Sequence, residues 1–234
     1  MLELRGIDGS YGGIRALRDF NLEIAPGSTT ALLGRNGAGK STALKLMSGA
    51  LLPSNGHVFW QGKRIDAKPP EERVRLGIAL VPEGRGIFPG LSVEENLRIG
   101  AYADKPRAKE LSRRMDLAFG RLPTLARLRR STAGRLSGGE QQMLTVARAL
   151  MGNPKVLLLD EPSLGLAPKI VEELYELFAS LRDGSLSIVL VEQYVSFALD
   201  LCDHALVLEK GEVVASGTGA ELLARDALSA AYLG

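Results

Sequence analysis

The chain has few of the features that mark secreted or membrane-spanning proteins. Its 234 residues include one cysteine, Cys202, so an internal disulfide is excluded and the chain fits a reducing cytoplasm. We expect that cysteine to be a small buried side chain. No apolar run approaches the roughly 20 residues that a membrane-spanning helix needs. Residues 1–5 lack the basic-then-apolar pattern of a signal peptide. Any action at a membrane is therefore expected to go through partner proteins.

Charge and aromatic content are also modest. The formal net charge of +2 gives no strong attraction to nucleic acid or to a membrane surface. Hydrophobic residues make up 45% and charged residues 24%, which is the balance of a globular chain long enough for a substantial core. Arginines are frequent over residues 113–135, but aromatic residues are not interleaved with them as they are in single-strand binders. We interpret this region as a solvated helical face and expect no nucleic-acid partner.

Apolar periodicity predicts an α/β core interrupted by a helical insertion. Alternating residues in the first 24 positions favour antiparallel strands, and residues 89–134 are helical in pattern. Elsewhere, strands are predicted at residues 30–33, 57–60, 78–81, 156–159 and 187–191, with a hairpin of 205–208 and 213–215. Two βα stretches far apart in sequence would then form one mainly parallel sheet.

Two further helices are predicted within this core. One follows residue 41 and ends near Gly49, and the other runs from Pro168 to Arg182. The apolar face of the second helix is expected to carry Ile170, Val171, Leu174, Phe178 and Leu181.

Residues 34–41 read GRNGAGKS and match the phosphate-loop pattern GxxxxGK[ST] at every fixed position. Glycines let backbone N–H groups turn toward phosphate oxygens, and the following helix presents its positive end. Lys40 supplies a mobile charge for the β- and γ-phosphates, and the Ser41 hydroxyl can ligate Mg²⁺. A glycine-rich turn alone does not explain why a lysine and a hydroxyl residue follow the last glycine in that order. The predicted nucleotide-binding residues here are Gly34, Arg35, Asn36, Gly37, Ala38, Gly39, Lys40, Ser41 and Thr42.

Two acids follow the predicted strand at residues 156–159. Carboxylates at the carboxyl end of a sheet strand lie where open α/β sheets bind ligands. Asp160 is placed to hold Mg²⁺ through a water molecule, and Glu161 to polarise the water that attacks the γ-phosphate. An acid after a buried strand is often only a turn signal, so this interpretation depends on the phosphate loop upstream.

Residues 136–142 read LSGGEQQ and open another helix. Ser137 and Glu140 have the spacing of a capping box, and the bare glycines Gly138 and Gly139 make the same helix end an anion site. The phosphate loop already cradles its own phosphates. This second site is therefore predicted to serve a nucleotide held by another subunit.

With these three motifs in order, the chain resembles the ATP-binding subunit of ABC transporters over nearly its whole length. The resemblance implies one ABC ATPase domain over residues 1–234. Its phosphate-loop core would comprise about 1–88 and 135–234, with an N-terminal antiparallel β subdomain, and its helical subdomain about 89–134. It also implies that two subunits dock head to tail, each ATP and Mg²⁺ lying between one phosphate loop and the other subunit's LSGGEQQ helix. Hydrolysis would then drive two transmembrane partners.

The resemblance also assigns residues outside those motifs. Tyr11 would stack on adenine, although a tyrosine there also suits a β-turn. Glu83 stands where the family has a glutamine that touches Mg²⁺, and we expect Arg85 to offset its charge. Gln193 replaces a histidine that contacts the γ-phosphate, and Ala167 replaces an aspartate. These departures predict reduced or partner-dependent hydrolysis.

The local sequences VPEGR, PSLGLAP and VEQ are similar to one branch of the family, the second ATPase of branched-chain amino acid importers. That branch implies a non-identical partner ATPase, two membrane permeases and a separate binding protein, with this chain peripheral on the cytoplasmic face of the inner or plasma membrane. A homodimer could form in isolation. A urea or short-amide importer is the alternative cargo class. A DNA- or ribosome-associated ABC ATPase and an ATP sensor that does not hydrolyse ATP are further alternatives.

Overall fold

The computed structural model describes residues 1–182 and 184–224, so residue 183 and residues 225–234 of the predicted 1–234 unit lie outside it. A six-stranded sheet with the order β10-β9-β3-β8-β7-β6 forms its centre. Every neighbouring pair is parallel except β9 and β10. The strands are β3 (Thr29–Leu33), β6 (Ile78–Val81), β7 (Val156–Asp160), β8 (Ser187–Val191), β9 (His204–Glu209) and β10 (Glu212–Gly217). The predicted mainly parallel sheet is confirmed.

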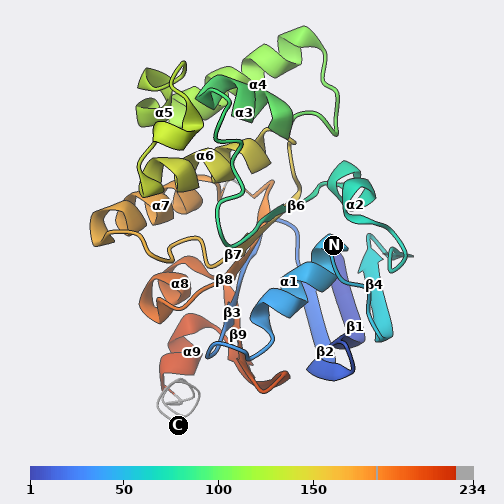
Figure 1. Ribbon diagram of the computed structural model, residues 1–234. Coiled ribbons are helices and arrows are strands. Elements are labelled where there is room, and N and C mark those ends of the chain that lie inside the picture. The colour runs from blue at the N-terminus through green and yellow to red at the C-terminus, as the bar shows by residue number, and fades with distance from the viewer. Residues whose placement is uncertain (183, 225–234) are drawn as a thin grey trace.

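A second, antiparallel sheet lies beside the first and is built mostly from the start of the chain. Its order is β2-β1-β4-β5, with β1 and β2 forming a hairpin whose turn follows Tyr11. The strands are β1 (Leu2–Tyr11), β2 (Ile14–Ile24), β4 (Asn55–Trp60) and β5 (Lys63–Arg64). Helix α1 (Lys40–Ser48) contacts both sheets and lies between them in Figure 1. The helix that follows the phosphate loop is thereby fixed on two sides.

Helices α6 to α8 pack on the face of the parallel sheet opposite α1, α2 lies on the side of α1, and further helices cover one end of the molecule (Figure 1). Helices α3 to α5 fall within residues 89–134 and lie together at that end, and the 3₁₀ turn η1 ends one residue beyond that range. Their bounds are α2 (Pro70–Leu76), α3 (Val93–Gly100), α4 (Ala108–Arg121), α5 (Pro123–Arg127), η1 (Ala133–Arg135), α6 (Gly138–Leu150), α7 (Pro168–Ser180), α8 (Val195–Leu201) and α9 (Gly219–Ala224). Within the described ranges no helix is long and apolar enough to cross a bilayer.

Alternate residues of the parallel strands enter two separate apolar clusters. On β7, Leu157 and Leu159 belong to the cluster with α6 and α7, whereas Val156 and Leu158 join α1 and the antiparallel sheet. Both faces of the strand are buried, which is why its sequence is apolar throughout. The expected apolar face of α7 is mostly buried.

Two residues are less buried than the sequence predicts. Ile170 is only half-buried and lies against Gly139 at the start of α6 instead of entering the core. Cys202 is also half-buried, and its side chain packs against the edge of the cluster beneath α7 and α8.

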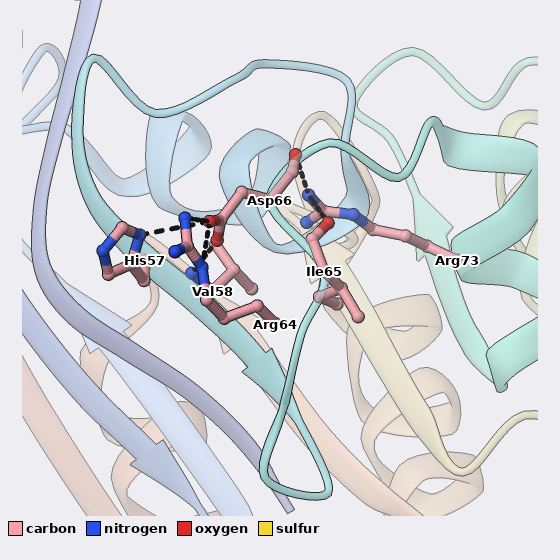
Figure 2. Close-up of polar contacts among 6 residues, drawn as sticks. All are labelled: His57, Val58, Arg64, Ile65, Asp66 and Arg73. Atoms are coloured by element: carbon pink, nitrogen blue, oxygen red, sulfur yellow. Dashed lines mark hydrogen bonds and ion pairs between the residues drawn. The ribbon is translucent and has the colours of Figure 1, made fainter.

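Arg73 on α2 is an unpredicted feature of the fold. Its side chain is fully buried. Figure 2 shows the guanidinium reaching the segment after β5, and two of its bonds cap the last turn of α1. It donates to five backbone carbonyls, those of Leu46, Met47, Ile65, Asp66 and Lys68. Burial lowers the pKa of Arg73 to about 10, so the group stays charged at neutral pH.

The carboxylate of Asp66 makes a second set of bonds in the same region (Figure 2). It accepts the backbone N–H of Val58 on β4 at 2.5 Å and the Arg64 guanidinium at 2.6 Å. Nδ1 of His57 lies 3.1 Å from the same carboxylate. Asp66 and Arg73 together tie the antiparallel sheet to α1.

Replacing Arg73 with methionine is expected to lower the free energy of unfolding by about 2 kcal/mol or more, since it leaves buried carbonyls without donors. Urea denaturation followed by circular dichroism measures this. Arg75→Met on the exposed side of the same helix is the matched control and should change stability by less than about 0.5 kcal/mol. Equal effects of the two substitutions would mean that the buried bonds contribute nothing specific.

Candidate active site at the phosphate loop

The phosphate loop joins β3 to α1, and glycines are required at two of its positions. Gly34 has φ +143°, and a Cβ there would lie 2.3 Å from the Leu208 carbonyl oxygen. Gly39 has φ +106°, and its Cβ would meet the Ala16 carbonyl oxygen at 2.7 Å. Only glycine tolerates both the left-handed backbone and this close approach. The loop is consequently held against β2 and β9 by contacts that a side chain would prevent.

Lys40 begins α1 and folds its side chain back across the loop. Its Nζ donates to the carbonyl oxygens of Gly34 at 2.8 Å and Arg35 at 3.2 Å. The same ammonium lies 3.7 Å from Oε1 of Glu161, and both side chains are largely buried. Burial lowers the pKa of Lys40, while the neighbouring Glu161 charge opposes that shift. The lysine is thus held over the loop, beside Glu161, the acid that directly follows β7.

Ser41 and Asp160 lie in direct contact at the carboxyl edge of the sheet. The Ser41 hydroxyl donates to Oδ1 of Asp160 at 2.9 Å. Burial raises the pKa of Asp160, the Ser41 bond opposes this, and the charges of Glu161 and Glu83 add to it. A divalent cation would relieve this concentration of negative charge. Within the described residues no group of three or more His, Cys, Asp or Glu side chains forms a complete metal site. One carboxylate and one hydroxyl are a donor set that suits Mg²⁺ completed by phosphate and water oxygens.

Glu161 and Gln193 lie just after the adjacent parallel strands β7 and β8. Glu161 has φ +46°, which is uncommon outside glycine, and its N–H donates to the Val191 carbonyl at 3.0 Å. Gln193 Nε2 donates to Oε2 of Glu161 at 2.7 Å and to the Asn36 side chain at 3.1 Å. The amide of Gln193 therefore bridges the acid and the phosphate loop.

A cleft of about 460 Å³ lies beside the loop and is lined by half of the predicted site residues. Sequence reasoning did not identify two of its members, Ala16 on β2 and Leu164 after Glu161. Both are apolar positions that carry no motif signal. The lining residues are Ala16, Asn36, Gly37, Gly39, Lys40, Ser41, Thr42, Glu83, Glu161, Leu164 and Gln193.

Tyr11 does not line this cleft. It ends β1, and 42% of its surface is exposed. The Lys45 ammonium lies over its ring, 5.6 Å from the ring centre. The ring is thus presented to solvent from the hairpin that borders α1.

The start of α6 lies apart from the phosphate loop of the same chain. None of the residues 137–140 lines the cleft beside the loop. Ser137 and Glu140 form the predicted capping box: the Glu140 carboxylate accepts the Ser137 N–H at 2.7 Å, and the Ser137 hydroxyl accepts the Glu140 N–H at 3.3 Å. The chain therefore carries two anion-suited helix ends that do not share one site.

Arg85 departs from the sequence prediction. Its Nη1 donates to the Gln141 side chain at 3.1 Å, and the guanidinium lies against Gly138. In the described part of the chain it forms no ion pair with Glu83: its backbone is left-handed and its side chain lies against the start of α6. Glu83 therefore lies at the edge of the cleft without the ion pair that the sequence predicted.

Comparisons with known proteins agree with this geometry. The family model described as ABC transporter matches residues 17–164. The chain is 43% identical over 235 residues to the high-affinity branched-chain amino acid transport ATP-binding protein BraG of Pseudomonas aeruginosa, covering all of both chains. It is 42% identical over 228 residues to the probable branched-chain amino acid transport ATP-binding protein LivF of Archaeoglobus fulgidus, covering 97% of this chain and 95% of that one.

Solved structures give the same result. The ADP conformation of MJ1267, an ATP-binding cassette of an ABC transporter, superposes with a TM-score of 0.89 at 27% identity, covering 100% of this chain and 98% of that one. The fold is thus shared with that cassette along the full length of this chain. It holds the phosphate loop, the acid pair at the end of β7 and the separate capped helix. The chain belongs to the ABC transporter family, as one of its ATP-hydrolysing subunits.

Proposed function

We propose that the chain powers the import of branched-chain amino acids through separate membrane permeases. The observation that carries this proposal is the full-length identity of 43% and 42% to two ATP-binding proteins named for that transport, from a bacterium and an archaeon. The cargo does not contact the ATPase subunit. The identity of the cargo is therefore inferred from sequence similarity to these relatives and not from the site. A urea or short-amide importer is the competing cargo class.

For nucleotide binding, we assign the phosphates to the backbone of residues 34–42 and to the Lys40 ammonium. Lys40 would exchange its bonds to the loop carbonyls for phosphate oxygens. Tyr11 is assigned to the adenine, which its exposed ring can reach by stacking from the β1–β2 hairpin.

Ser41 and Asp160 are proposed as the protein ligands of Mg²⁺, with Glu83 near enough to contribute a carboxylate. Bound Mg²⁺ would neutralise charge that develops on the phosphates. Glu161 is assigned to orient and deprotonate the attacking water, and Gln193 to hold Glu161 and contact the γ-phosphate by an amide N–H.

The capped end of α6, formed by Ser137, Gly138, Gly139 and Glu140, is assigned to the nucleotide of a second ATPase subunit. This is supported by its separation from the cleft beside the chain's own phosphate loop. The partners proposed are a non-identical ATPase, two transmembrane permeases and a binding protein outside the membrane. The chain would sit peripherally on the cytoplasmic face, with no nucleic acid involved.

Uptake measurements in the organism that encodes the chain test the cargo. Deleting the gene should abolish high-affinity uptake of labelled leucine, isoleucine and valine, and leave urea and acetamide uptake unchanged. The wild-type gene should restore uptake, whereas the Lys40→Ala variant should not. Loss of urea or acetamide uptake, with leucine uptake intact, would show that the chain serves a urea or short-amide importer instead.

A further inference from the structure

Glu192 is a buried carboxylate that the roles assigned above do not use. It follows β8 directly and precedes Gln193, and 1% of its surface is exposed. Oε1 accepts the N–H of Ser163 at 3.1 Å, and Oε2 accepts the N–H of Gln193 at 3.0 Å. One side chain thus holds the backbone of two different loops.

These two loops carry the residues that act on the γ-phosphate. Ser163 lies two residues after Glu161, and the Gln193 amide donates to Oε2 of Glu161 at 2.7 Å. A closed ring of bonds therefore runs from Glu161 through Gln193 and Glu192 to Ser163, and back to Glu161 along the chain. Glu192 connects the two loops by its side chain from the buried side of this ring.

The surroundings of Glu192 are costly for a charge. Tyr175 on α7 and the Ser163 hydroxyl face it, yet both hydroxyls lack a hydrogen-bond partner of good geometry in the described residues. Burial raises the pKa of Tyr175, and the charge of Glu192 adds to that shift. The same charge opposes the lowering of the Lys40 pKa by burial. Burial raises the pKa of Glu192, and its bonds to Ser163 and Gln193 oppose that shift. A buried acid without an ion-pair partner is unusual in a purely structural position and typical of functional sites.

We propose that Glu192 is a positioning residue for ATP hydrolysis, which fixes the backbone of Gln193 and Ser163 so that the Gln193 amide stays on Glu161. The proposal rests on the roles proposed for Glu161 and Gln193. It requires both carboxylate oxygens as acceptors, because each holds a different loop.

Glu192→Gln tests this with little change in volume, since the amide NH₂ that replaces one oxygen cannot accept a hydrogen bond. In the full-length chain assembled with its partner ATPase, we expect kcat to fall about tenfold, with KM and the Kd for MgATP unchanged within threefold. Glu172→Gln, on the exposed face of α7, is the matched control and should leave kcat unchanged.

A double-mutant cycle with Gln193→Ala separates positioning from a general structural effect. In the Gln193→Ala background, Glu192→Gln should reduce kcat by less than about twofold. A tenfold loss in both backgrounds, or an unchanged kcat in the wild-type background, would overturn the proposal. If Glu161→Gln proved fully active, the proposed function of Glu161 would fail instead, so the two failures are distinguishable.

Amide hydrogen exchange on the wild-type chain provides a test that does not depend on a folded variant. The amides of Ser163 and Gln193 should exchange at least ~10-fold more slowly than that of Gly165, which is exposed in the same loop as Ser163. Exchange as fast as that of Gly165 would show that Glu192 does not hold these loops in solution, and would overturn the proposal.

Discussion

Glu161→Gln is expected to bind MgATP within about threefold of the wild-type affinity and to hydrolyse it ~100-fold or more slowly. Glutamine keeps the shape and can still accept the bond that Gln193 donates to Glu161 at 2.7 Å. It cannot take a proton from water, so the loss falls on the chemical step. Single-turnover hydrolysis and equilibrium binding measure the two quantities separately.

The control for this prediction is Glu172→Gln, which removes an exposed carboxylate from α7 and should change neither quantity. The carboxylate of Glu161 also lies 3.7 Å from Lys40, so its removal changes the charge around the phosphate-binding ammonium. A large loss of MgATP binding would therefore assign Glu161 to charge balance in the cleft. Near-normal turnover would remove it from the role of base.

The placement of the phosphate loop and of the acid pair could be predicted from sequence because each is a local pattern joined to a general rule. Residues 34–41 follow β3, and Asp160 ends β7. In parallel sheets the carboxyl ends of the strands meet at one edge, so these motifs converge without knowledge of the strand order. Gln193 after β8 reaches the same edge for the same reason. The capping box at the start of α6 is likewise a four-residue signal.

Arg73 and Glu192 could not be found in this way. Each looks in sequence like an ordinary charged residue, and its meaning comes from partners far along the chain. The α1 carbonyls to which Arg73 donates lie 26 and 27 positions away in the sequence, and Ser163 lies 29 positions from Glu192. Arg85 was predicted to face Glu83 because they are neighbours in sequence, yet its backbone has φ +65° and turns the side chain to α6. Local spacing predicts convergence of motifs but not the direction of a side chain on a strained loop.

Ser137→Arg is expected to leave MgATP binding by the isolated chain unchanged within about threefold and to reduce hydrolysis by the assembled pair ~100-fold or more. The reason is geometric: residues 137–140 lie outside the cleft of their own phosphate loop, so a bulky side chain there disturbs only a nucleotide brought by another subunit. Binding to the isolated chain and ATPase activity of the pair are the measurements.

The helix cap itself must be separated from this effect, because Ser137→Arg also removes one bond of the Ser137–Glu140 capping box. Helix α3 offers a matched control: Ser92 and Glu95 form an equivalent capping box in the helical region. Ser92→Arg should cost the same stability, about 1 kcal/mol, while the assembled pair keeps its activity. If Ser137→Arg weakened nucleotide binding in the isolated chain as much as activity in the pair, the helix end would act on the chain's own nucleotide. If both arginine variants disabled the pair equally, the loss would belong to the caps and not to a site shared between subunits.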